Sequence, residues 1–238
     1  TGDKVKVEGN VTCEGGIITR ESGFLHAGKE VRARFIENST VKAGGAVRVE
    51  RAILNSRVYA NESIEAYSPR SFVIGGVLLA RCGLCVRHLG NDAGARSLVQ
   101  LGADWRDLEL YLETSARQRL LRDEAQKVDL EIQRVLKPHG GKSEALPPAQ
   151  KPAYRALLVR KNELVKEFRL LREETQRLLA RIEDVGGAEL QVLGYVFPDN
   201  TVRFGTAKHV TTGNLQNVRL TYDRESREVR VSPGKSVR

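Results

Sequence analysis

The chain has 238 residues and a formal net charge of +9, from 39 Lys and Arg against 30 Asp and Glu. Its hydrophobic fraction of 40% is enough for a sizeable core and argues against intrinsic disorder, and the chain has no run of about 20 apolar residues that would cross a membrane. Three cysteines are too few for a disulfide framework and favour a reducing compartment, so we expect a cytoplasmic protein.

The basic excess is spread along the chain and is not gathered in one tail. A positive net charge permits contact with an acidic protein, an anionic membrane surface or nucleic acid. Aromatic residues make up only 5% of the chain, so stacking platforms for bases are scarce and we expect no sequence-specific nucleic-acid binding. The chain opens at Thr1 and has no methionine, from which we expect a piece of a longer protein.

A short template recurs through residues 1–103: an apolar-x-apolar triplet, three turn residues and a second such triplet. The paired triplets begin at Val5 and Val11, Leu25 and Val31, Val41 and Val47, Val58 and Ile64, and Leu78 and Leu84. Most of the corners hold the Gly or Asn that a tight bend with positive φ favours. Strands this short are unstable alone, but each one gains two neighbours when the copies stack in parallel.

This repeat predicts a right-handed parallel β-helix with short coils of about 17 residues. Residues 36–39 and 53–56 are 17 positions apart and are expected to form a third face. A β-sandwich of short strands is the alternative, but the small residues that return at one inward position favour the β-helix. A left-handed hexapeptide helix fits less well, because the period is not a multiple of six.

From Asp104 the apolar spacing changes to the alternating three and four of a heptad. The first seam is Leu121, Ala125, Val128, Ile132 and Val135, and the second is Leu157, Lys161, Leu164, Phe168, Leu171, Thr175, Leu178, Ile182 and Val185. We therefore predict a mainly β protein with a long α insertion, an antiparallel coiled-coil hairpin over 104–185 with a Pro- and Gly-rich tip at 137–152. The first part of the β-helix occupies 1–103, and strands in 186–238 complete the same body.

Several segments resemble a known family in their order and spacing. These are Phe72-Val-Ile-Gly-Gly-Val-Leu-Leu-Ala80, Leu89-Gly90, Val99-Gln-Leu-Gly102, the charged hairpin, and Leu190-Gln-Val-Leu-Gly-Tyr-Val-Phe-Pro198. Over about residues 25–210 the chain resembles the flagellar assembly protein A family. The resemblance implies a bacterial cytoplasmic protein with a further N-terminal domain, linked to flagellar assembly or polar placement and without established catalytic residues. Asp199-Asn200 departs from the family, in which a glycine is usual at that turn.

The residue types that carry most catalysis and metal binding are scattered. Cys82-Gly-Leu-Cys85 is a lone CxxC pair, whereas a zinc site needs a second pair or nearby His. No two carboxylates fall at equivalent positions of adjacent coils, as a carbohydrate-active β-helix would require. We assign no catalytic, cofactor-binding or metal-binding residue and do not expect an enzyme.

Two basic surfaces are the candidates for partner binding. On the β-helix, Lys6 and Lys42 share one outward position of successive coils, or rung, with His26, and Arg32 and Arg48 share another rung. On the second helix the candidates are Lys166, Arg169 and Arg172. A solvated face is the ordinary interpretation of each. We interpret the chain as a noncatalytic scaffold that binds flagellar or polar protein factors through the coiled-coil arm or the β-helix face. A self-polymerising β-helical element, a homo-oligomer, peripheral membrane contact and a carbohydrate-active enzyme are the alternatives.

Overall fold

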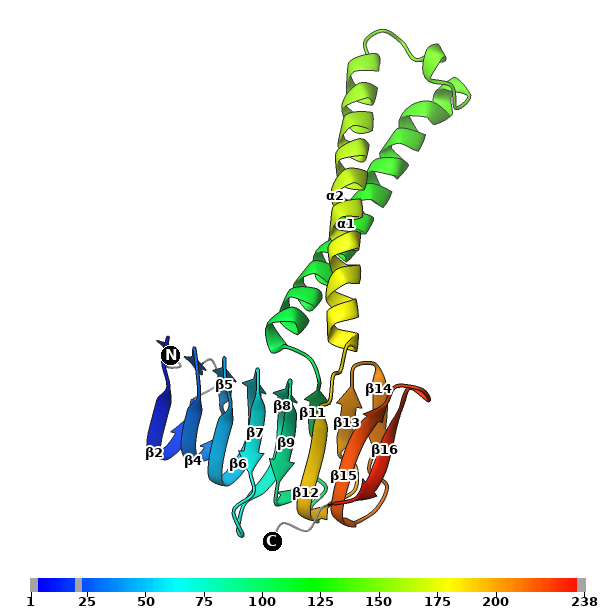
Figure 1. Ribbon diagram of the computed structural model, residues 1–238. Helices are drawn as coiled ribbons and strands as arrows, with labels where there is room; N and C mark the ends of the chain where they lie inside the picture. The colour runs from blue at the N-terminus through cyan, green and yellow to red at the C-terminus, as the bar shows by residue number, and fades with distance from the viewer. Residues whose placement is uncertain (1–3, 20–22, 235–238) are drawn as a thin grey trace. The chain divides into compact units, whose positions relative to one another are not determined.

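A computed structural model describes residues 4–19 and 23–234 of the chain (Figure 1). The strands before the helices are β1 (Lys4–Val7), β2 (Val11–Ile18), β3 (Phe24–Ala27), β4 (Val31–Glu37), β5 (Thr40–Ala43), β6 (Val47–Ala60), β7 (Ser63–Ala66), β8 (Phe72–Ala80), β9 (Gly83–Val86), β10 (His88–Leu89) and β11 (Ser97–Leu101). The chain forms two compact units, one of residues 108–180 and one of the residues before and after them.

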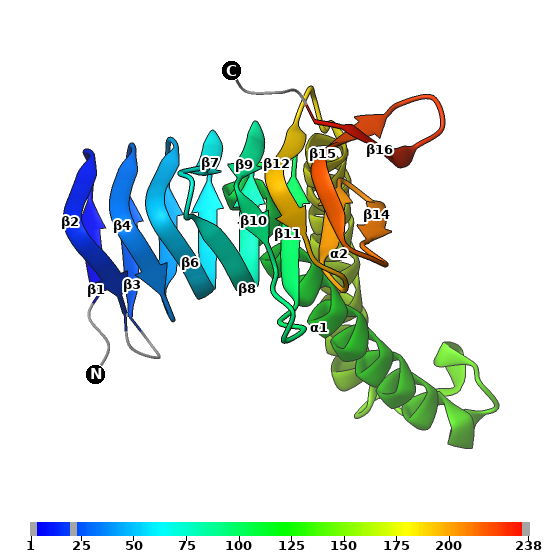
Figure 2. The same ribbon diagram turned by 90° about the horizontal axis from the view of Figure 1, so that it is seen from below.

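Every pairing among β1 to β11 in the described residues is parallel, so these strands form stacked coils (Figure 2). Leu25, Val41, Val58 and Leu78 stand in register on successive coils, and all four are buried. These residues occupy the same position of the repeat template. The predicted parallel β-helix, or β-solenoid, is therefore confirmed, while its handedness stays a prediction.

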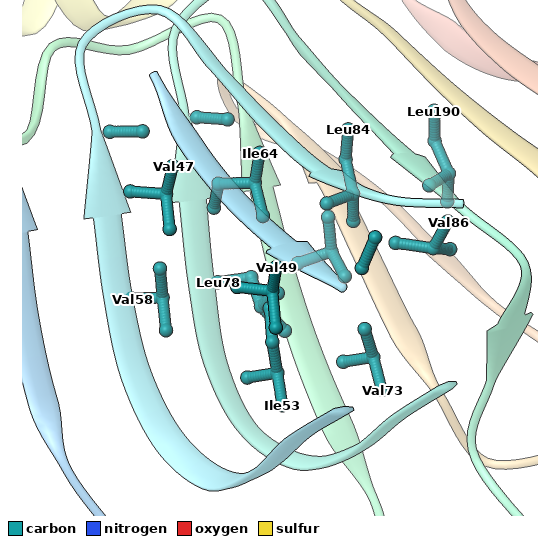
Figure 3. Close-up of a cluster of buried hydrophobic side chains, with 14 of the residues drawn as sticks. Val47, Val49, Ile53, Val58, Ile64, Val73, Leu78, Leu84, Val86 and Leu190 are labelled. Atoms are coloured by element: carbon teal, nitrogen blue, oxygen red, sulfur yellow. The ribbon is translucent and has the colours of Figure 1, made fainter. Parts of the chain in front are cut away.

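The solenoid interior is one continuous core. Figure 3 shows part of it, with Val47, Val58, Ile64, Leu84 and Val86 pointing inward from neighbouring strands. A ladder of small residues, Ala27, Ala43, Ala60 and Ala80, stands beside these side chains, and each alanine is fully buried. The small residues that the sequence places at one inward position thus keep the core narrow at that position.

A third face is present where the repeat predicts it. Ile36, Ile53 and Val73 stand in register in β4, β6 and β8 and are fully buried. The chain turns directly after each of them through a left-handed residue, with φ of 47° at Asn38 and 43° at Asn55. Asparagine tolerates this conformation better than other non-glycine residues, which explains why it recurs at this corner.

The predicted helical hairpin is also confirmed. Helices α1 (Trp105–Leu136) and α2 (Lys151–Glu183) are joined through two short 3-10 turns, η1 (Lys137–His139) and η2 (Ser143–Ala145). The residues that fill the space between the helices are Leu121, Ala125, Val128, Ile132, Leu157, Leu164, Phe168 and Leu171. Most of both predicted seams therefore lies at this contact. Val135, at the end of the first seam, is outside the cluster, to which the neighbouring Leu136 belongs, and Val185, at the end of the second seam, lies beyond α2 and packs in the solenoid core.

The two polar positions of the second seam have partners on the first helix. The Lys161 ammonium lies 2.6 Å from the Asp129 carboxylate. The Gln118 side-chain amide donates a hydrogen bond of 2.7 Å to the Thr175 hydroxyl. The breaks in the apolar pattern are therefore matched polar pairs across the hairpin, which fix its register.

After the hairpin the coils resume and then change direction. Strand β12 (Glu189–Val196) pairs in parallel with β9 and β10, and β13 (Thr201–Phe204) pairs in parallel with β11. Strands β14 (Ala207–Val210), β15 (Leu215–Asp223) and β16 (Glu228–Pro233) are antiparallel to their neighbours. The sequence pattern locates strands here but does not indicate their reversed direction, and the domain boundaries at 103 and 186 stay predictions.

Candidate partner-binding surfaces

The rung that begins with Lys6 is built as the repeat predicts. Lys6, His26, Lys42 and Tyr59 stand in register at outward positions of successive coils. The lysines lie against aromatic rings, with Lys6 Nζ 5.8 Å from the ring centroid of Phe24. Lys42 Nζ is 4.9 Å from the ring of Trp105 and 5.9 Å from that of Tyr59. These cation–π contacts partly satisfy the two charges within the solenoid unit.

Trp105 is the residue of this surface that the sequence interpretation missed. It is only 6% exposed, and its indole N–H donates a hydrogen bond of 3.2 Å to the Ala43 carbonyl. His26 meets its ring edge-on at 5.6 Å. The chain contains one tryptophan, at the start of a predicted helix, and this was the signal from which a structural anchor could have been predicted.

Arg32 and Arg48 share a rung, as predicted, but acidic residues separate their charges. Arg32 lies 2.6 Å from the Glu30 carboxylate, which also pairs with Arg48. Arg48 is 3.0 Å from Glu65, its register neighbour on the next coil. The Arg32 hydrogen bond, followed by contact with Arg48, holds the pKa of Glu30 below its ordinary value. Sequence spacing alone identifies Glu65, which follows Arg48 by 17 residues, whereas Glu30 is found only in the folded corner.

An open groove of about 400 Å³ runs beside this ion-paired rung. Its lining includes Glu14, Glu50 and the half-exposed ring of Tyr67, together with Arg32 and Arg48. Its lining contains both carboxylates and guanidinium groups. The groove is therefore a mixed polar surface and not a basic patch.

The hairpin residues Lys166, Arg169 and Arg172 are all exposed on α2. In the part of the chain that the structure describes, none of the three takes part in an ion pair. Other basic residues of the hairpin do, such as Arg117 at 2.9 Å from Glu167. The three candidates thus retain their full positive charge toward solvent.

The two cysteines of the CxxC pair lie outside the solenoid core. Cys82 is exposed in a corner, and Cys85 points outward between Glu65 and Gln191. Burial, aided by Glu65 and Glu189, raises the pKa of the Cys85 thiol, which disfavours the reactive thiolate. Within residues 4–19 and 23–234, no group of three or more His, Cys, Asp or Glu side chains is arranged to hold a metal ion.

Residues 1–228 match the family described as the flagellar assembly protein A β-solenoid domain (FapA). The chain belongs to this family. The match covers the solenoid and the inserted hairpin and confirms the family that the sequence resembles. No curated protein and no solved structure gives a match. Across the described residues, no helix is long and apolar enough to cross a membrane.

The segments that carry the FapA resemblance are structural. Residues 72–80 form β8, which pairs with β6, β10 and β11 and so lies at the centre of the stack. Gly90 and Gly102, which end the next two segments, have φ of 87° and 88°. A side chain at Gly102 would overlap the backbone of Val185, so glycine is required there for both conformation and space.

The turn at Asp199-Asn200, where the resemblance led us to expect a glycine, is held by side-chain hydrogen bonds. Asp199 adopts a left-handed conformation with φ of 64°. Asn200 is fully buried and accepts a hydrogen bond of 3.0 Å from the Ser97 N–H, while its amide donates one of 2.8 Å to the Phe197 carbonyl. The hydrogen bonds of Asn200 therefore stabilise a turn for which glycine would supply conformational freedom instead.

Proposed function

We propose that this chain is a noncatalytic scaffold in flagellar assembly or polar placement, acting in the cytoplasm, and that its hairpin binds a protein partner through Lys166, Arg169 and Arg172. The family and the β-solenoid fold fit a role related to flagellar assembly. The observation that carries the choice of surface is a contrast in charge. Arg32 and Arg48 are paired with carboxylates on the solenoid, whereas Arg169 and Arg172 have no ion pair in the described residues.

Unpaired exposed arginines favour association with an acidic protein surface. Long-range attraction raises the rate of encounter, and a guanidinium group can then form two hydrogen bonds to one carboxylate. The paired arginines of the solenoid would first have to give up Glu30 and Glu65. We therefore propose the hairpin as the main recognition element and the face with Lys6, Lys42, Arg32 and Arg48 as a secondary one.

The self-polymerising alternative has less support. Unlimited end-to-end stacking of a solenoid needs an open parallel strand at both ends. Past the last parallel pairings, β14 covers β13 and β15 covers β12 in antiparallel orientation. The solenoid is therefore bordered by antiparallel pairs at β14 and β15, whereas β1 and β2 belong to parallel pairs.

The test is replacement of the gene in the native host by two variants, one lacking residues 108–180 and one with Lys166, Arg169 and Arg172 changed to Glu. We expect both to reduce swimming and to disturb the number or position of flagella seen by electron microscopy. The matched control changes three other exposed hairpin residues, Lys127, Arg134 and Arg177, to Glu. Normal flagellation in the strain without the hairpin would overturn the proposed function.

A further inference from the structure

Residues three or four positions apart share a face of an α-helix, so the hairpin has two distinct flanks beside its seam. One flank carries Arg119 and Arg122 on α1 and Arg169 and Arg172 on α2, and all four are exposed. Two contacts show that these stripes adjoin. Gln118, next to Arg119, bonds Thr175, and the Arg122 guanidinium lies 6.0 Å from the ring centroid of Phe168, next to Arg169.

This arginine flank, defined as Arg119, Arg122, Arg169 and Arg172, has no ion pair in the described part of the chain. The interhelical pairs Arg117–Glu167 and Arg160–Glu124 lie on the opposite flank. Residues 104–185 contain 17 Lys and Arg against 15 Asp and Glu, but these charges are not distributed evenly around the hairpin. Four guanidinium groups gather on one side, together with Asp129, which follows Arg122 by seven residues and pairs with Lys161, while Glu124, Glu167 and their partners occupy the other side.

Two aliphatic side chains accompany the arginine flank on α2. Leu158 is 36% exposed and Val165 is 38% exposed, and they are seven residues apart. Residues seven positions apart occupy the same position of successive heptads, about 10.5 Å apart along the helix. Arg172, seven residues after Val165, occupies this position as well. The flank thus combines two exposed aliphatic side chains, spaced as in a helix that packs in a coiled coil, with positive charge beside them.

We propose that the arginine flank binds an acidic amphipathic helix of a partner protein. Its apolar face would pack on Leu158 and Val165 as a third helix, and its carboxylates would pair with the four arginines. A membrane surface or a nucleic acid would pair with the arginines, but neither would pack against aliphatic side chains at heptad spacing. The inference rests on the proposed function and sharpens it, because it adds Arg119 and Arg122 of α1 to Arg169 and Arg172 and names the kind of partner that these residues would bind.

The experiment uses the whole chain and a labelled synthetic peptide of three heptads, with leucines on one face and glutamates beside them. Fluorescence anisotropy is measured against this peptide and against one with lysine at each glutamate position. We expect the acidic peptide to bind at least tenfold more tightly and to weaken as salt rises to about 0.15 M. Changing the four arginines of the flank to Glu should reduce its affinity more than tenfold, and L158Q/V165Q about fivefold.

The matched control changes four exposed basic residues of the hairpin outside the flank, Lys127, Arg134, Lys142 and Arg177, to Glu, and circular dichroism confirms that every variant is helical. Equal loss with both sets of four would overturn the proposal, as would equal binding of the two peptides. Tighter, flank-dependent binding to phosphatidylglycerol vesicles or to single-stranded DNA would also overturn it. The proposed function fails separately, if the host without the hairpin swims normally.

Discussion

At the scale of single residues, the neighbours of each basic side chain decide whether its charge is available. Glu30 accepts hydrogen bonds from both Arg32 and Arg48, and its side chain is mostly covered. The stacking of two arginines in one rung would be unfavourable alone. With Glu30 and Glu65 beside them, the same rung becomes a local ion-pair network.

Glu30 also gives the solenoid a defined dependence on pH. Because the pKa of its carboxyl is lowered on folding, the carboxylate stabilises the native state above the ordinary value of about 4.5, and this contribution is lost as pH falls through the lowered pKa. We expect Glu30→Gln to lower the free energy of unfolding at pH 7 by roughly 0.2–1 kcal/mol, since the arginines are partly exposed. Urea melts at several pH values measure this; an equal difference at pH 7 and pH 3 would contradict it.

The alanine ladder makes a second prediction at this scale. Ala43 and Ala60 are fully buried and in register, so a phenylalanine at either position has no space. We expect Ala43→Phe and Ala60→Phe each to cost ~1–3 kcal/mol in the free energy of unfolding. Urea denaturation measures the cost, with Lys6→Phe at an exposed position as the control. Unchanged midpoints for both alanine variants would refute the register of the coils.

At the scale of elements, the hairpin trades some stability for a fixed register. Its seam contains the Gln118–Thr175 hydrogen bond and the Lys161–Asp129 ion pair among aliphatic residues. A polar pair inside a coiled coil disfavours shifted alignments, in which each polar group would face an apolar one. The register matters here because it brings the α1 arginines level with those of α2.

Replacing both members of the hydrogen-bonded pair should therefore stabilise the hairpin. We expect the double variant Gln118→Leu with Thr175→Leu to gain about 1–2 kcal/mol from added apolar burial. The thermal midpoint of the helical signal at 222 nm measures this gain. Gln126→Leu, at an exposed position, serves as the control and should leave the midpoint unchanged. A lower midpoint in the double variant would show that the pair stabilises the seam.

At the scale of the whole molecule, the two compact units draw on separate cores. The solenoid core contains residues from both sides of the insertion, such as Val86 and Leu190. The hairpin core, by contrast, consists of residues of α1 and α2, such as Leu121 and Phe168. Trp105 belongs to the solenoid unit through its hydrogen bond to Ala43, although it is the first residue of α1.

Removal of the hairpin should therefore leave a folded solenoid. We expect a variant with residues 108–180 replaced by a short glycine linker to lose most of its helical circular dichroism and to keep its β signal. Trp105, the one tryptophan, should retain the fluorescence of a buried indole. Loss of the β signal together with the spectrum of an exposed indole would show that the solenoid depends on the hairpin.

The periodic patterns of the sequence are sufficient to predict the coils and the hairpin. Buried residues recur with the period of a strand or a helix. The spacing of apolar residues in Val41-x-Ala43 and in the seam around Leu164 therefore predicts which of them are buried. The sequence also located the candidate basic residues and the turn at Asp199. The antiparallel direction of β14, β15 and β16 could not be predicted in this way, because apolar and polar residues alternate in the same manner in parallel and antiparallel strands.

Which basic residues remain available for a partner depends on contacts between segments far apart in the chain. Glu30 meets Arg48 across a corner, Trp105 reaches Ala43 over 62 positions, and Arg122 lies near Phe168 across the hairpin. Such pairs depend on the alignment of segments far apart in the chain, which no local pattern encodes. The arginine flank arises in the same way, because the antiparallel register of α1 and α2 places two pairs of arginines side by side.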